Sequence, residues 1–534
     1  MIFEHLFPCK ASEDALLARV PDMMRDHETA RLQCVAPTQY QRDAVHSTVL
    51  SFAAAHGRKM YGAWALRQAL LGCHDVDPGD TDPARCSAAP ELEFYSPTPV
   101  ADAIELADRL FAAGHHYVQA REAAAHGTYT LSVEFVRLCS ITYAPKRLFT
   151  AIPTLPSQVP GVPPIVSPSF MIMDYLRVLC DPFTSYYRLD RSLPRLVMLQ
   201  RHFPIAVPET TTHVLEATTA TTDAAPVKIK IRPAMATAVA WAAGRPSCVS
   251  LVEHARAFFA KSVGLKPPRS VQQLTLVTVD YVADLVSLAD MFGDSAHIVE
   301  HSELMGLLGR RSVLRVDGHI VMVLIDAAGR SVPVNGRSED GLLVAGFSYC
   351  LLASMALRFL ASVNSRPGTE CTAVRFHSSV IGDLLAYRRK WSESGDSVCD
   401  VTSPFRDIEL SYIGWPMSDM RFHMAMTDRR RVDVGSSRPT VWMTYDPSRP
   451  ATKPYRYMML RCDGEPVPTP FSTLTKTRLV ASMEAKLETA TLHPPPPAGD
   501  QAADDNINNA AAAATTTSDD VSSIHVRLPI SLDP

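Results

Sequence analysis

The stretch that decides the fold is Pro90–Pro99, PELEFYSPTP, in which an expected strand runs directly into a turn. Successive side chains of a strand point to opposite faces, so Glu91 and Glu93 share one face while Leu92 and Phe94 take the other. Two carboxylates side by side are the kind of ligands that a hard divalent cation requires. The alternative is an ordinary solvated strand face, and this stretch alone does not separate the two interpretations.

A helix is expected immediately after this strand. Thr98 is a suitable N-cap, Pro99 suits the first helical position, and Gly114 suits the end. The pair Glu105 and Arg109 has the favourable i,i+4 spacing. The positions expected to form the apolar stripe of this helix are Val100, Ile104, Ala107 and Phe111.

A second element with chemical potential lies upstream, in RKMYGAWALRQALLG (58–72). Lys59 to Tyr61 reads as a short strand, Gly62-Ala63 as a tight turn and Trp64 to Leu71 as a helix. A strand–glycine–helix junction brings backbone N–H groups close to a phosphate at a helix N-terminus. Many such turns only connect elements, so this junction alone is weak evidence of a phosphate-binding site.

Two further strands are expected downstream, in 128–136 and 138–145. Alternation puts Ser140 and Thr142 of the second strand on one face. The residues of the first strand expected to face the core are Tyr129, Leu131, Val133 and Phe135, with Thr130, Ser132 and Glu134 facing away. Those of the second strand opposite Ser140 are Cys139, Ile141 and Tyr143.

The order of these segments resembles the catalytic subunit of poly(A) polymerase from large nucleocytoplasmic DNA viruses, of the nucleotidyltransferase superfamily. The matching stretches, within about residues 56–205, are YGAWAL (61–66), ELEFYSP (91–97), REAAAHGTYT (121–130), SITYAP (140–145) and MDYLRVLCDPFTSYYRLD (173–190). The resemblance implies an α/β (α+β) fold: a polymerase-β-like nucleotidyltransferase palm with flanking helices, and a second C-terminal α/β domain.

The activity that the resemblance implies is addition of AMP from ATP to RNA 3′ ends, without a template, in mRNA polyadenylation. In the family three carboxylates bind two divalent metals, Mg²⁺ or Mn²⁺. On this chain the catalytic positions are Glu91, Glu93 and Ser140, with Glu91 and Glu93 as the metal ligands. Gly62 and Ala63 take the place of the turn that positions the triphosphate. The implied partners are the RNA 3′ end, ATP, and either a second copy of the chain or a partner subunit.

Several positions depart from the family pattern. Ala63 stands where the family has glycine, Glu91 and Glu93 stand where aspartate is usual, and Ser140 replaces the third carboxylate. A neutral hydroxyl does not supply the missing charge to the metal. These departures favour lost or weakened catalysis, so the alternative function is an inactive paralogue that binds RNA or a partner. Glu134 and Asp174 are the acids nearest in sequence that are candidates to replace the missing one.

An RNA contact is expected on Arg188, Arg191 and Arg195, whose i, i+3, i+7 spacing puts three guanidinium groups on one helix face. Tyr186 or Tyr187 is a candidate to stack a base. Pro194 is expected to interrupt the helix, and a solvated face is the simpler alternative. The histidines expected to be structural are His115, His116 and His126.

Composition narrows the class of protein. The 534 residues carry a formal net charge of −4, which excludes a strongly basic nucleic-acid binder and requires any nucleic-acid contact to come from a local basic face. Eleven cysteines without CxxC spacing indicate free thiols in a reducing compartment and no zinc site. We see no secretory signal and no apolar run of about 20 residues, so we expect a soluble, intracellular protein without membrane contact. With the resemblance, that means the viral factory, the host cytoplasm or the virion.

The chain is expected to divide at composition changes, and no internal repeat is evident in the sequence. The segment PETTTHVLEATTATTDAAP is rich in Thr and Ala, and the C-terminal stretch is polar and of low complexity. The expected parts are an N-terminal helical segment (1–55), the nucleotidyltransferase-like domain (56–205), a linker (206–227), a C-terminal α/β domain (228–490) and a disordered tail (491–534).

Overall fold

The structure is a computed structural model that divides into two compact units. Unit 1 comprises residues 1–143, 154–166 and 436–459, and unit 2 comprises 144–153, 167–435 and 460–534. The described residues are 10–35, 38–71, 91–123, 127–155, 161–205, 228–267, 273–327, 330–365, 371–395, 400, 402–406, 409, 411–414, 444–449 and 463–464. The units therefore follow bounds different from the expected domains, and the expected linker and tail lie outside the described residues.

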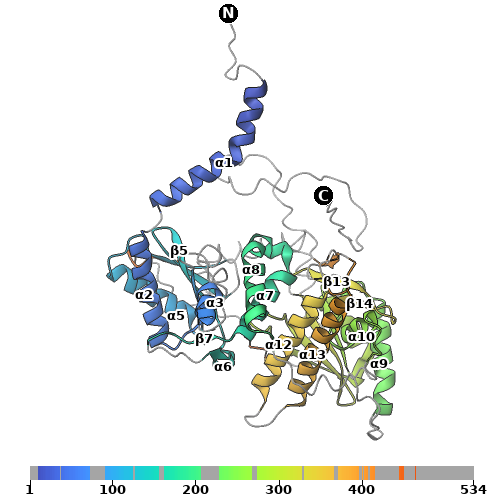
Figure 1. Ribbon diagram of the computed structural model, residues 1–534. Helices are drawn as coiled ribbons and strands as arrows, with labels where there is room; N and C mark the ends of the chain where they lie inside the picture. Colours follow the sequence, from blue (N-terminus) through green and yellow to red (C-terminus); the bar gives the residue numbers. More distant parts are fainter. Residues whose placement is uncertain are drawn as a thin grey trace, which may run out of the picture. The chain divides into compact units, whose positions relative to one another are not determined.

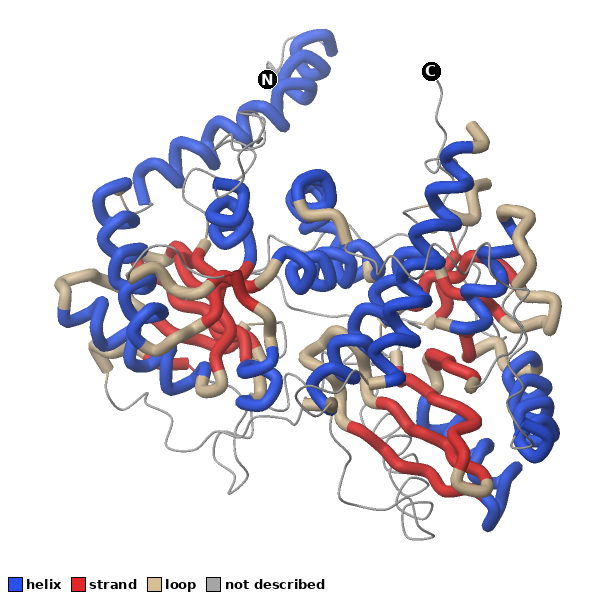
Figure 2. Tube along the Cα trace, turned by 60° about the horizontal axis from the view of Figure 1, so that its bottom comes forward, coloured by secondary structure: helices blue, strands red, loops and turns tan. Residues whose placement is uncertain are grey.

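Unit 1 is a mixed sheet with helices packed against it (Figures 1 and 2). Its sheet order is β16-β3-β4-β5-β2-β1-β7-β6, so β2 lies near the middle, parallel to β5 and antiparallel to β1. The helices that pack on the sheet are α2 (Gln39–Ala55), α3 (Gly62–Leu71) and α5 (Pro99–Ala112), and the further helix α1 (Lys10–Val35) is exposed along its described side chains. The strands are β1 (Lys59–Tyr61), β2 (Leu92–Ser96), β3 (Gln119–Glu122), β4 (Thr128–Val133), β5 (Val136–Tyr143), β6 (Thr154–Leu155), β7 (Ile165–Val166) and β16 (Thr444–Tyr445).

The apolar face of this sheet packs against α2 and α5. Leu92 and Phe94 of β2 are fully buried, and the ring of Phe94 lies 6.4 Å from that of Phe52 on α2. Burial of such side chains supplies the main stabilising free energy of the unit. The alternation expected for β2 is confirmed, since Glu93 is only half-buried between two fully buried neighbours.

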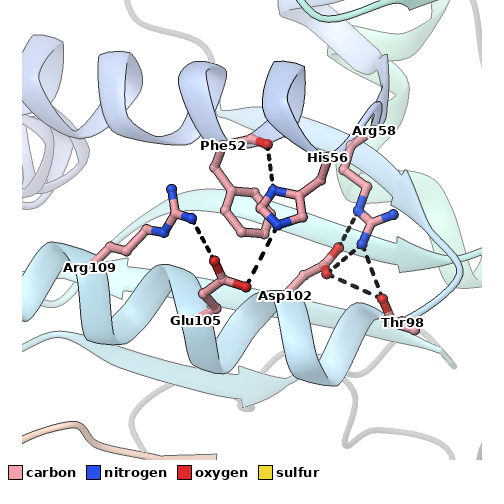
Figure 3. Close-up of polar contacts among 7 residues, drawn as sticks. All are labelled: Phe52, His56, Arg58, Thr98, Asp102, Glu105 and Arg109. Carbon is pink, nitrogen blue, oxygen red and sulfur yellow. Dashed lines mark hydrogen bonds and ion pairs between the residues drawn. The ribbon is translucent and has the colours of Figure 1, made fainter.

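A buried ion pair joins the start of β1 to the start of α5 (Figure 3). The guanidinium of Arg58 donates to both carboxylate oxygens of Asp102 at 2.7 and 2.8 Å, and to Thr98 Oγ1 at 3.1 Å. The hydroxyl of Thr98 donates to Asp102 Oδ1 at 3.3 Å. Thr98 occupies the N-cap position, but its side chain does not cap the helix because it is engaged in this pair.

The other expectations for α5 are largely confirmed. Arg109 donates to Glu105 at 2.6 Å, and Gly114 follows the helix with φ +89°. The helix buries Val100, Ile104 and Ala107 as expected, with Leu110 completing the stripe. Phe111 was expected in the stripe and is instead 44% exposed, in the last turn of α5.

The strand expected over 128–136 ends earlier than its alternation suggests. β4 stops at Val133, and Glu134 and Phe135 form a left-handed turn with φ of +49° and +66°. Phe135 was expected in the core and is 78% exposed, since the turn removes it from the strand's alternation. Its ring stacks on Tyr117 with 4.8 Å between centroids.

Unit 2 is a second mixed α/β unit with sheet order β10-β11-β12-β9-β8-β14-β13-β15. The helices are α6 (Lys146–Ala151), α7 (Pro168–Cys180), α8 (Pro182–His202), α9 (Lys228–Ala243), α10 (Glu253–Ser262), α11 (Tyr281–Phe292), α12 (Phe347–Asn364) and α13 (Thr372–Glu393), with the 3-10 turn η3 (Gly293–Ser295). The strands are β8 (Cys248–Ser250), β9 (Leu274–Thr278), β10 (Ala296–His301), β11 (Arg311–Val316), β12 (His319–Asp326), β13 (Val332–Arg337), β14 (Leu343–Ala345) and β15 (Ser411–Ile413).

The sheet of unit 2 repeats the topology of unit 1. The run β3-β4-β5-β2-β1-β7-β6 corresponds strand for strand to β10-β11-β12-β9-β8-β14-β13, with the same parallel and antiparallel pairings. The helices that follow β2 and β9 also share two sequence motifs at the same spacing. The helix after β2 has VAD at 100–102 and LAD at 106–108, and the helix after β9 has VAD at 282–284 and LAD at 288–290. The chain therefore holds an internal repeat that sequence reading missed.

In unit 2, α12 is long and apolar enough to cross a membrane by length and composition, but 67% of it is buried inside the protein. It packs beside α7, where Phe170 and Phe359 meet edge to face at 5.1 Å. Its burial identifies α12 as a core helix of unit 2.

Candidate nucleotidyl-transfer site

The polar face of the unit 1 sheet gathers the predicted site residues. Tyr61 pairs with Glu93, Glu93 pairs with Ser140, and Ser140 pairs with Thr130 across four adjacent strands. Directly paired residues of a sheet project to the same side, so these side chains share one face. This register brings Glu93 and Ser140 together on one face.

Glu91 lies one residue before β2 and its carboxylate is fully engaged. Arg137 donates to Glu91 Oε2 through Nε at 2.9 Å and through Nη2 at 2.7 Å. The hydroxyl of Ser140 donates to Glu91 Oε1. Ser140, which is predicted to stand in the place of the family's third carboxylate, therefore holds Glu91 in place, and the negative charge of Glu91 is balanced by a guanidinium.

Sequence reasoning missed Arg137 because strict alternation assigns it to the other face, with Cys139 and Ile141. A β-bulge between β4 and β5 changes that assignment: Leu131 pairs with Cys139, but Ser132 pairs with Arg137, so β5 carries one extra residue. A bulge re-aims the side chains beyond it and is common beside active sites. Arg137 consequently shares the face of Ser140.

The glycine turn lies directly against the second carboxylate. Gly62 has φ +76°, and a Cβ built on it would lie 1.8 Å from Glu93 Oε2 and 2.6 Å from Glu93 Cδ. No side chain fits there, so the carboxylate occupies the space that only a glycine leaves free. Ala63 is buried behind the turn. The predicted phosphate-binding turn and the predicted metal ligand thus meet at the N-terminus of α3.

The donor set fits a hard cation shared with substrate phosphates. Within the described residues, no group of three or more histidine, cysteine, aspartate or glutamate side chains is placed to hold a metal ion alone. Two carboxylates remain, Glu91 and Glu93, next to a helix N-terminus. Magnesium is usually held by one or two carboxylates together with substrate phosphates, which matches this set.

The two acids considered as replacements for the missing carboxylate are engaged elsewhere. Glu134 lies in the β4–β5 turn and accepts a hydrogen bond from Gln41 at 3.1 Å. Asp174 lies on α7 in unit 2 and binds Arg177 at 2.8 Å. Within the described residues, the partners of these two acids thus differ from those of Glu91 and Ser140.

The expected arginine stripe lies on α8 of unit 2. The helix continues through Pro194, so the expected interruption is wrong, and the i, i+3, i+7 spacing is kept on one continuous helix. Arg191 is exposed, with Asp190 4.0 Å away, whereas Arg188 and Arg195 are half-buried. The Nε of Arg195 has no hydrogen-bond partner in the part of the chain that the structure describes.

The structure describes only some of the remaining expected residues. His115 is half-buried and His116 is exposed, both following the end of α5, and His126 lies outside the described residues. The side chains of Tyr186 and Tyr187 also lie outside them. A cavity of about 810 Å³ in unit 1 is lined by α2 and residues 161–162, not by the carboxylates.

Unit 2 shows what the same architecture looks like without the carboxylates. By strand register, Val252 corresponds to Gly62, Thr275 to Glu93 and Val323 to Ser140. Val252 has a positive φ of +52°, as Gly62 does in unit 1 with φ +76°. The carboxylates and the glycine are thus present in one copy of the sheet and absent from the other.

Comparison with known proteins finds the same family that the sequence motifs resemble. Residues 47–185 match the family model described as poly(A) polymerase catalytic subunit. Over 188 residues the chain is 35% identical to a protein of Acanthamoeba polyphaga mimivirus named for that subunit, covering 35% of this chain and 31% of the relative. A relative from African swine fever virus (isolate Pig/Kenya/KEN-50/1950), with the same name, is 28% identical over 124 residues, covering 22% and 26%. The matches span less than a third of either relative.

The fold extends well beyond the matched sequence. The crystal structure of the Megavirus polyadenylate synthase superposes with a TM-score of 0.68 at 20% identity, covering 88% of this chain and 94% of that one. The expected α/β fold, with helices flanking a mixed sheet and a second α/β unit, is therefore confirmed as the fold of that structure. Residues 47–185 match the poly(A) polymerase catalytic subunit family, as the sequence motifs predict, on the fold of a viral polyadenylate synthase.

Proposed function

We propose that this chain adds AMP from ATP to the 3′ end of RNA, as a viral-type poly(A) polymerase catalytic subunit. The observation that carries the proposal is the close approach of Gly62 to the carboxylate of Glu93. It brings a phosphate-binding turn and a metal ligand together, and the corresponding positions of unit 2 hold Val252 and Thr275. A positive φ is common to both turns, but only unit 1 combines a glycine at that position with an acidic side chain at the paired one.

Each residue has a distinct role in the proposed reaction. Glu91 and Glu93 hold a divalent cation, Mg²⁺ or Mn²⁺, which supplies charge stabilisation for nucleophilic attack at phosphorus when it is bound. Backbone N–H groups at Gly62 and Ala63 receive the triphosphate of ATP at the α3 N-terminus. Ser140 orients Glu91 through its hydroxyl. The RNA 3′ hydroxyl attacks the α-phosphate of ATP and pyrophosphate leaves.

RNA contact beyond the reacting end is assigned to the arginines of α8. Arg188, Arg191 and Arg195 follow one face of a continuous helix, which suits a phosphate backbone. The word subunit in the names of the relatives supports a further partner, either a second copy or another chain. The proposed setting is the viral factory, the host cytoplasm or the virion.

The inactive alternative has less support. The relatives are named as catalytic subunits, and none of these comparisons favours an inactive paralogue. The loss of the family's third carboxylate is accompanied by a specific contact, since Ser140 now binds Glu91. Unit 1 therefore keeps an organised site where unit 2 does not.

A tailing assay tests the proposal and separates it from the alternative. Purified full-length chain is incubated with a short RNA primer, ATP and either magnesium or manganese. Tails that disappear with Glu93→Ala support the catalytic assignment. If no tail forms, but Ser140→Asp with Glu91→Asp restores activity, the chain is the degenerate paralogue instead.

A further inference from the structure

The ion pair between Arg137 and Glu91 occupies a carboxylate that the proposed reaction needs for its metal. We propose that Arg137 is an internal counter-ion that competes with the divalent cation for Glu91 and yields it when nucleotide arrives. The inference rests on the proposed function, because it takes Glu91 as a metal ligand. It assigns Arg137 a positioning role in addition to the roles proposed for Glu91, Glu93 and Ser140.

The contacts are those of a direct competitor. Arg137 donates twice to Glu91 Oε2, at 2.9 and 2.7 Å, and Ser140 donates to Oε1. Both oxygens that would face a cation are therefore already hydrogen-bonded. A carboxylate held by a guanidinium has to lose that partner, or share it, before it can coordinate a divalent ion.

The exposure of the two side chains makes the exchange feasible. The side chain of Arg137 is 57% exposed, whereas that of Glu91 is 21% exposed. Exposed ion pairs are weak because water screens them and because long side chains lose conformational entropy in forming them. Arg137 can therefore swing into solvent while Glu91 stays in place, held by Ser140.

The placement of Arg137 requires a specific backbone feature. Without the extra residue in β5, Arg137 would project to the apolar face with Cys139. Cys139 is fully buried there, and burial raises the pKa of its thiol well above the ordinary value, with further contributions from Glu91 and Glu93. A guanidinium on that face would be buried without a partner, so the bulge is what makes the contact with Glu91 possible.

Binding of nucleotide with its cation can replace the ion-pair partners of Arg137 and Glu91 in one step. A guanidinium binds phosphate oxygens through parallel hydrogen bonds as readily as it binds a carboxylate. ATP with its cation thus offers Arg137 a new anion and Glu91 a new cation in the same step. We therefore expect metal binding and nucleotide binding to be coupled through Arg137, and the coupling to be equal in both directions.

Binding of Mn²⁺ to the full chain without nucleotide tests this directly. Electron paramagnetic resonance reports the free Mn²⁺ concentration in titrations of wild type and Arg137→Gln. Removal of the competitor should tighten Mn²⁺ binding on the order of threefold, the scale of an exposed ion pair. The added variant Glu91→Gln should remove this gain.

The matched control is Arg109→Gln. Arg109 also forms an exposed pair with a glutamate, Glu105, at 2.6 Å, but it lies on α5, which packs on the apolar side of the sheet. We expect this variant to bind Mn²⁺ as wild type does. A non-hydrolysable ATP analogue should tighten Mn²⁺ binding less in Arg137→Gln than in wild type.

Unchanged or weaker Mn²⁺ binding by Arg137→Gln overturns the inference, even if the wild-type chain makes tails. Tighter binding that depends on Glu91 supports it, even if the wild-type chain makes no tail, in which case only the proposed activity fails. Tightening that Arg109→Gln reproduces reflects net charge and also overturns the inference.

Discussion

Replacing Gly62 by alanine tests the contact on which the proposed site depends. The added Cβ would lie 1.8 Å from Glu93 Oε2 and 2.6 Å from Glu93 Cδ, well inside van der Waals contact. The obstructing atoms are the far end of a flexible side chain, so the backbone is expected to stay and the carboxylate to rotate away. The variant therefore displaces a proposed metal ligand without unfolding the sheet.

The expected effects on stability and on activity differ in size. An alanine at φ +76° costs about 1–2 kcal/mol of folding free energy, the ordinary penalty of a left-handed residue. A displacement of the carboxylate by about 1 Å costs on the order of 100-fold in rate. Urea unfolding measures the first quantity, and the rate of primer extension measures the second.

Gly57→Ala is the matched control for this prediction. Gly57 has φ +60°, and no described atom lies within 4 Å of a Cβ placed there, so this variant carries the backbone penalty alone. The two variants should lose similar stability, while only Gly62→Ala loses activity. Shortening the carboxylate in Gly62→Ala/Glu93→Asp should recover part of the rate. Equal tailing rates in Gly62→Ala and Gly57→Ala would refute the reasoning.

Three further predictions concern stability. Arg58→Ala leaves a buried carboxylate unpaired and should lower the free energy of unfolding by about 3–5 kcal/mol in urea titrations; a loss under about 1 kcal/mol would contradict the buried pair. Ser140→Asp places a second carboxylate beside Glu91, and the two negative charges repel each other. The melting temperature should therefore fall in EDTA and recover when Mn²⁺ is added. A fall that Mn²⁺ does not reverse would count against a metal site. Burial, with Arg358 adding to it, lowers the pKa of His377 to about 4, so the unfolded chain binds a proton before the folded one as pH drops below 6.5. Stability should fall by about 2 kcal/mol between pH 8 and pH 5, and His377→Gln should remove that part of the pH dependence.

Local patterns in the sequence predicted the elements around the site. Alternation placed Leu92 and Phe94 opposite Glu93, and helix signals placed the end of α5 before Gly114. These features depend on neighbouring residues and on the periods of strands and helices. The sequence predicts these features because each depends on residues only a few positions apart.

Features that depend on distant contacts were not readable in the same way. The bulge opposite Leu131 is set by pairing between strands, and it decides on which face Arg137 lies. The turn at Phe135 ends the alternation two residues earlier than the letters suggest. The capping role expected of Thr98 is lost to Arg58, a residue forty positions away.

Two residues that depart from the family pattern make specific contacts in the structure that the sequence alone did not indicate. Ser140 appeared in the sequence as a missing charge, and in the structure it is the hydrogen-bond donor that holds Glu91. Glu93 appeared as a longer replacement for aspartate, and in the structure its carboxylate lies against Gly62. These contacts link residues that lie tens of positions apart.

The most direct test of the central claim follows the label of α-labelled ATP into RNA. The wild-type chain should transfer the label to the primer 3′ end and release one pyrophosphate for each AMP added. Glu93→Gln should abolish both, whereas Glu134→Gln, which changes an acid of the same unit outside the carboxylate face, should retain both. Label transfer that survives Glu93→Gln, or none by wild type with either metal, would contradict the account.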